Sequence, residues 1–137
     1  MSYAVAAALQ EAVYQRLTTD PALTGLVGNA IYDAMPAGNL PETYVTLGPE
    51  DVRIRGDQSA GGAWHRFDVS VVTGNAGFHA AKQVAAAVND ALVDADLPLS
   101  RGSLAGLRFF RARARRERNG QLRRIDLTFR ARVDDTV

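Results

Sequence analysis

Apolar residues recur at every fourth position near the N-terminus, from Val5 to Leu17. This spacing places them on one face of a helix that runs to about Thr18, and Ser2 stands where a helix cap is needed. Asp20 follows directly before a proline, which is the usual start of another helix, and the glycines that come next limit that helix to a single short turn. The N-terminal segment is therefore predicted to be helical.

The next segments alternate between apolar and polar residues, as strands do. The stretch NAIYDAMP predicts a short edge strand that ends at Pro36, and ETYVTLG predicts a half-buried strand. The stretch WHRFDVSVVTG also alternates and predicts another strand. Between the last two lies GDQSAGG, which has no period, so we expect a loop across which the two longer strands pair.

A helical period returns from about Ala76 to Ala95 and predicts the longest helix of the chain. Asn75 is placed to cap it, which accounts for the preceding glycines more simply than an anion site does. The alanines on its apolar face permit close packing against a sheet. That face consists of Phe78, Ala81, Val84, Ala85, Val88, Ala91 and Leu92.

The C-terminal segment predicts a β-hairpin, because the dipeptide Asn119-Gly120 favours a two-residue turn with positive φ at both positions. If Arg118 pairs with Gln121, every pair on one face is apolar, and the arginines lie on the other face. This register buries Phe110 and Phe129. The apolar pairs are Ala114 with Ile125, Ala112 with Leu127 and Phe110 with Phe129, and the other face carries Arg115 opposite Arg124, Arg113 opposite Asp126 and Arg111 opposite Thr128.

Together these segments predict an α+β fold. We expect a mainly antiparallel sheet of about four strands, with two main helices packed on one face and a C-terminal β-hairpin, in a single domain over residues 1–137. No apolar run is long enough to cross a membrane, and the N-terminus lacks the unbroken apolar stretch of a signal peptide. Synthesis in the cytoplasm and no membrane partner are therefore expected.

Charge is divided unevenly along the chain, although the net charge is only +1. Residues 1–52 carry one arginine and six acidic residues, whereas residues 108–137 carry ten arginines and four acidic residues. An acidic front and a basic back can attract one another between subunits, or present a basic surface to a polyanion. The arginine face of the hairpin thus has three interpretations: a solvated surface, a contact with a subunit or partner, or a contact with nucleic-acid phosphates.

Candidate chemistry is sparse. With no cysteine, the chain has no disulfide, thiolate metal site or cysteine nucleophile. The two histidines, His65 and His79, lack the spacing that would bring metal ligands together, and no G-x-S-x-G motif is present. We therefore expect no enzyme activity, no cofactor and no metal.

The order of elements resembles that of the tail-completion, or tail terminator, proteins of long-tailed phages and gene transfer agents. The passages that carry the resemblance are LVGNAIYDAMP, PETYVTLG and the strand plus alanine-rich helix after Trp64. The resemblance implies a subunit made in the bacterial cytoplasm that assembles as a six-membered ring at the head-proximal end of the tail. There it would end polymerisation of the tube and provide the joint to the capsid neck.

The partners that the resemblance implies are other copies of the chain, the major tail tube protein, the neck connector and, transiently, DNA passing through the ring. No catalytic residue transfers from this family. Two other functions stay open: a small nucleic-acid-binding protein that uses the basic hairpin without sequence preference, and a neck or adaptor component of the same particle.

Two groups of residues are the candidates for these contacts. The candidates for the lumen or the subunit interface are Arg111, Arg113, Arg115, Arg124, Arg130 and Arg132. The candidates for an assembly loop, which would order when a neighbour or the tube arrives, are Arg53, Arg55, Asp57 and Trp64.

Overall fold

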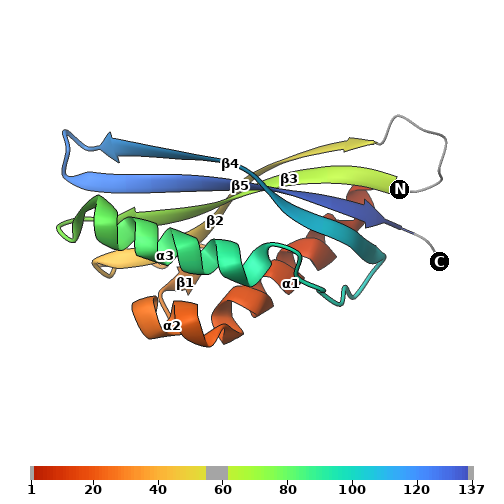
Figure 1. Ribbon diagram of the computed structural model, residues 1–137, viewed down its shortest axis with the longest axis horizontal. Helices are drawn as coiled ribbons and strands as arrows, with labels where there is room; N and C mark the ends of the chain where they lie inside the picture. The colour runs from red at the N-terminus through yellow and green to blue at the C-terminus, as the bar shows by residue number, and fades with distance from the viewer. Residues whose placement is uncertain (1, 55–61, 136–137) are drawn as a thin grey trace.

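A computed structural model describes residues 2–54 and 62–135. It contains a sheet with three helices and a short 3₁₀ helix, so the α+β class predicted from the sequence is confirmed (Figure 1). The elements in chain order are η1 (Ser2–Val5), α1 (Ala6–Thr19), α2 (Pro21–Val27), β1 (Ile31–Tyr32), β2 (Thr43–Ile54), β3 (Gly62–Thr73), α3 (Gly77–Leu92), β4 (Ser103–Glu117) and β5 (Leu122–Asp134).

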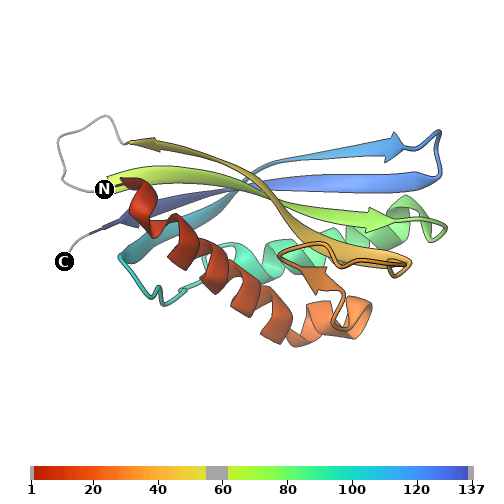
Figure 2. The same cartoon turned by 180° about the vertical axis from the view of Figure 1, so that it is seen from behind.

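The sheet has five strands in the order β1-β2-β3-β5-β4, rather than about four. The short edge strand predicted in NAIYDAMP is β1, which ends at Tyr32 rather than at Pro36; it lies parallel to β2, while all other neighbours are antiparallel. The helices cover one face of the sheet and leave the other uncovered, as the two opposite views show (Figures 1 and 2). We call the uncovered side the open face.

The N-terminal helix is confirmed, but its cap is not. The chain enters it through the 3₁₀ turn η1, and the cap position of α1 is Val5, which makes no side-chain capping bond. Ser2 was therefore wrong as the cap. By contrast, the Asp20 carboxylate accepts a hydrogen bond from the Leu23 N–H at 3.0 Å, as the sequence predicted for α2.

The long helix α3 is confirmed, with shorter bounds than predicted. Its cap position is Ala76 rather than Asn75, and no side chain caps it. The backbone N–H of Asn75 donates to the carboxylate of Glu42, which holds the residue before the helix by a tertiary contact.

The core lies between the helices and the covered face of the sheet. Alternate residues of β3 and β5 point into it, and they meet the apolar rows of α1 and α3 that the helical periods predicted. The largest fully buried side chains include Phe129, Leu17, Leu23, Ile31, Leu92 and Leu107.

The hairpin turn is confirmed. Asn119 and Gly120 have φ values of 56° and 85°, and the Gln121 N–H donates to the Arg118 carbonyl at 3.1 Å. The register is also confirmed from the turn back to Arg111, which lies opposite Thr128.

Beyond Arg111 the predicted register is wrong. A β-bulge between Phe109 and Arg111 inserts one residue, so Phe109 rather than Phe110 lies opposite Phe129. Phe110 consequently turns to the open face, where 41% of it is exposed, and it is not buried as expected.

A second irregularity interrupts β2 between Leu47 and Glu50. It lies in the same transverse row as the first, because Asp68 of β3 pairs with Thr128 of β5 between the two bulges. Bulges increase the local twist of a strand, and in Figure 1 the long strands visibly cross one another near their middle. The row divides the open face into two halves. One half lies near the β4–β5 turn, and the other lies near Ile54 and Gly62, where β2 ends and β3 begins.

Candidate functional site

The open face carries most of the arginines. Since paired residues share a face, the register places there the alternate residues of β3 and β5 that do not enter the core, with their partners on β2 and β4. The basic residues on this face are Arg53, Arg66, Arg108, Arg111, Arg113, Arg115, Arg124, Arg130 and Arg132.

In the half near the turn, acidic residues neutralise Arg115 and Arg124. Arg115 and Arg124 lie directly opposite one another, an unfavourable pair for like charges. Asp126 bridges them, with an oxygen 3.1 Å from Nη1 of Arg115 and the other 2.9 Å from Nε of Arg124. Glu117 accepts a hydrogen bond from Nε of Arg115 at 3.1 Å, so the repulsion between the two guanidinium groups is offset.

Asp126 is the centre of this network. Its side chain is only 14% exposed, and its carboxylate also accepts a 2.6 Å hydrogen bond from the Ser70 hydroxyl. Burial by itself would raise the pKa of Asp126, but the hydrogen bonds from Ser70 and Arg124 and the charges of Arg124 and Arg115 outweigh burial and lower it. The ionised form is therefore favoured in the folded protein.

In the other half, aromatic rings support two of the arginines, and the exposed Asp51 pairs with Arg53 at 3.3 Å. The guanidinium of Arg130 lies 4.0 Å from the centre of the Trp64 ring, and that of Arg66 lies 4.1 Å from the centre of the Phe110 ring. Arg130 pairs with Arg66 on one side and with Arg108 on the other, which makes a row of three arginines across the sheet. Stacking on a ring leaves the positive charge in place, so this half stays basic.

Three arginines of β4 on the open face form no ion pair with any described residue: Arg108, Arg111 and Arg113. All three are exposed on the outermost strand of the sheet. An unpaired, solvated guanidinium is available to a carboxylate or a phosphate of a partner.

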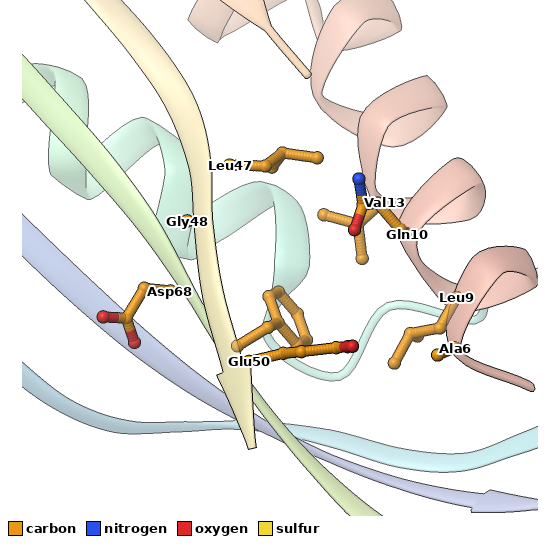
Figure 3. Close-up of a pocket in the computed structure, with 9 residues that line it drawn as sticks. Ala6, Leu9, Gln10, Val13, Leu47, Gly48, Glu50 and Asp68 are labelled. Atoms are coloured by element: carbon orange, nitrogen blue, oxygen red, sulfur yellow. The ribbon is translucent and has the colours of Figure 1, made fainter. Parts of the chain in front are cut away.

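The hollows of the molecule do not suggest catalysis. The cavity between α1 and β2, lined mainly by Leu9, Val13, Leu47 and Phe67, has a volume of only about 20 Å³, and Figure 3 shows Glu50 extending from β2 toward α1 beside it. The Tyr3 hydroxyl donates a 2.6 Å hydrogen bond to Glu50, which raises the pKa of Tyr3. Within residues 2–54 and 62–135, no three His, Cys, Asp or Glu residues are grouped closely enough to hold a metal ion.

The structure places all six predicted arginines on the open face but separates them by role. Arg115 and Arg124 belong to the neutralised network, Arg130 and Arg132 lie near the Trp64 ring, and the remaining two are unpaired. Of the assembly-loop candidates, Arg53 and Trp64 form a cross-strand pair at the free ends of β2 and β3. Arg55 and Asp57 lie outside the described residues.

Sequence reasoning missed three residues of this surface. Arg66 was recognisable as a polar position of an alternating strand, and only its stacking on Phe110 required the structure. Arg108 and Phe110 reach the open face because of the bulge, for which the sequence contains no signal.

Comparison with known proteins agrees with the resemblance seen in the sequence. The model of the family described as "Tail completion protein gp17" matches residues 11–134. A chain of the solved structure "Virion of native gene transfer agent (GTA) particle" is 61% identical, with 97% of this chain and 99% of that chain covered and a TM-score of 0.92. No curated protein matches.

The described helices are all too short or too polar to cross a membrane. The family match spans both the acidic N-terminal half and the arginine-rich hairpin, so it includes the whole of the open face. The chain therefore belongs to the family of the tail completion protein gp17, and it is a structural tail protein of a phage-like particle.

Proposed function

We propose that the protein assembles as a six-membered ring on the head-proximal end of the tail tube, ends polymerisation of the tube and provides the joint to the capsid neck. The observation that carries this proposal is the family match over residues 11–134, together with the virion described for the structural neighbour. The proposed partners are other copies of the chain, the major tail tube protein and the neck connector.

Two surfaces of opposite charge support ring formation. A head-to-tail contact between two different surfaces generates a closed ring when the rotation between subunits closes. The chain has such surfaces, because arginines line the β4 edge while the hollow on the outer side of α1 has Glu11, Asp33 and Glu50 as its charged residues.

We further assign the open face to the lumen of the ring. DNA leaving the head would pass this face, and its charges suit that role: one half is neutralised by Asp126 and Glu117, and the other keeps its positive charge. A moderate positive field attracts phosphates without reading a sequence, whereas a fully basic lumen would retain the DNA.

The test is deletion of the gene in the producing strain, with tail lengths measured by negative-stain electron microscopy. Overlong tails, restored to normal length by the wild-type gene, are expected. Normal tails that fail to join heads would assign the protein to the neck instead. Normal tails on complete, DNA-filled particles would rule out both roles.

The three unpaired arginines of β4 favour a second candidate function, direct binding of nucleic acid. A protein that neutralises phosphates releases counterions, so its affinity for DNA falls steeply as salt increases. Fluorescence anisotropy of the isolated, non-assembled protein with labelled DNA at several salt concentrations measures this directly. A steep salt dependence at micromolar affinity would support the second function, and no binding at low salt would exclude it.

A further inference from the structure

The sheet has two edges without a neighbouring strand among the described residues. β4 pairs only with β5, so its outer side is free. β1 pairs with β2 only at Val45 and Thr46, so β2 is free on that side from Leu47 to Ile54. Unpaired N–H and C=O groups along an edge can accept a strand from another chain.

A part of the β4 edge is already occupied. The N–H of Asp94, in the connection after α3, donates to the Leu107 carbonyl at 2.9 Å. The available part of β4 therefore runs from Arg108 to Glu117, which is the half of the strand that belongs to the hairpin.

Both free edges expose large apolar side chains. Ile54, near the end of β2, is 73% exposed, and Phe109 and Phe110 of β4 are 45% and 41% exposed. Exposed apolar residues along an unpaired edge promote association unless a partner covers them.

The charges of the two edges are complementary. The free part of β2 carries two acids, Glu50 and Asp51, and one arginine, Arg53, whereas the free part of β4 carries the unpaired Arg111 and Arg113. The hollow next to the β2 edge, about 550 Å³ in volume, has only acidic residues as its charged lining. Opposite potentials on the two edges favour contact between unlike edges over contact between like edges.

We propose that β4 of one copy adds as a strand to the β2 edge of a second copy, so that the sheet continues from subunit to subunit. This inference rests on the proposed ring and names the contact that closes it. Within one subunit β2 and β4 run in opposite directions, because three antiparallel pairings separate them. A neighbour related by rotation about an axis along the strands therefore presents an antiparallel edge.

The covered segments determine how the two strands align. β1 blocks the start of β2 and the Asp94 contact blocks the start of β4, so the hairpin half of β4 lies along the second half of β2. Among the registers that keep both faces matched, the one we propose places Ala112 opposite Val52, both on the helix side. On the open side it places Arg113 opposite Asp51, which are oppositely charged.

Disulfide cross-linking tests the contact, because the chain contains no cysteine. The variant carries Ala112→Cys together with Val52→Cys, and particles purified from the producing strain are oxidised and resolved on a non-reducing gel. A cross-link within one subunit is excluded, since β3 and β5 separate the two positions by about 14 Å, beyond the roughly 7 Å that a disulfide spans. A ladder of covalent oligomers that ends at the closed ring is expected.

The controls are matched in position. Each single cysteine variant, and the pair Arg113→Cys with Val52→Cys, whose side chains lie on opposite faces of the sheet, should stay monomeric. Dimers from Ala112→Cys alone would show that two β4 edges meet and would overturn the proposal. Particles with normal tails that contain the double variant but yield no cross-link would also overturn it, while leaving the proposed function intact.

A charge exchange provides a second measurement that does not depend on oxidation. Arg113→Asp or Asp51→Arg alone should reduce the yield of complete particles by about tenfold, because each brings like charges together at the junction. The double exchange should restore the yield. If the double variant loses yield by the sum of the two single losses, the proposed register is overturned. This result also tests the contact when the cysteine variant does not enter particles.

Discussion

At the scale of single residues, the clustered guanidinium groups of the open face are stabilised in two different ways. Near the hairpin turn, Asp126 and Glu117 accept hydrogen bonds from two opposed guanidinium groups. Near the other end, Trp64 and Phe110 support guanidinium groups by stacking. The first arrangement offsets the charge of two arginines and the second preserves it, so the open face is less basic near the hairpin turn than near Trp64.

We expect Asp126→Asn to lower the stability of the protein in a pH-dependent way. The pKa of Asp126 is lower in the folded state than its ordinary value, so its contribution is fully present above about pH 4 and is lost as the pH falls through the folded value. At pH 7 the loss should be about 1–3 kcal/mol, as for hydrogen bonds to a charged group.

Urea unfolding at pH 7 and at stepwise lower pH measures this difference. Asp51→Asn is the matched control, since that side chain is 53% exposed, and an exposed ion pair contributes less than about 1 kcal/mol. The gap between wild type and Asp126→Asn should close in acid. A gap that stays constant with pH would mean that the carboxylate charge is not what stabilises the network.

At the scale of elements, periodicity predicted what local sequence determines. The apolar rows of α1 and α3 and the Asn119-Gly120 turn are local signals, and all three elements are present. The caps by Ser2 and Asn75 were wrong because each α-helix begins later than expected: η1 separates Ser2 from α1, and Ala76 occupies the cap position of α3.

The bulge at Phe110 shows the limit of such reasoning. The hydrophobic pattern of a strand with one inserted residue is almost the same as that of a regular strand. The sequence therefore predicted the register correctly only from the turn to Arg111. Likewise, the sequence placed the arginines on one face but did not reveal that Arg130 stacks on Trp64 or that Ser70 supports Asp126, because Trp64 and Ser70 come from a strand distant in sequence.

The start of β4 depends on Gly102, and we expect Gly102→Ala to be strongly destabilising. Its φ is +72°, and an added Cβ would lie 2.5 Å from the Asp134 carbonyl oxygen and 3.0 Å from Cγ2 of Val5. Left-handed strain together with this overlap should cost about 3 kcal/mol of unfolding free energy.

Gly106→Ala, four residues further along β4, is the control. An added Cβ there meets no atom within 4 Å, and its φ is not in the left-handed region, so stability should change by less than about 1 kcal/mol. The two urea midpoints compare the variants directly. Equal midpoints would contradict the view that close contact of Gly102 with β5 and η1 fixes the start of β4.

At the scale of the whole molecule, the proposed ring would give the charge gradient of the open face a direction. Every subunit then presents its basic half, near Trp64, at the same level of the lumen, and its neutralised half, near Asp126, at the other. Repetition around the ring brings the basic halves, with the ring-stacked Arg66 and Arg130 of each subunit, to one level as a basic collar.

The collar is testable through the passage of DNA. Arg108→Gln with Arg132→Gln removes two exposed charges from the basic half of the open face. Because a contact between opposite charges at the surface is worth about 1 kcal/mol, DNA should leave particles up to about fivefold faster, and tail lengths should not change. The measurement is the time course of marker transfer to recipient cells.

Arg116→Gln with Arg118→Gln, on the covered side of β4 and in the turn, removes the same charge and should have no effect. Abnormal tails in the first variant alone would instead mean that the basic half contacts protein, and the lumen would have to be lined by another surface.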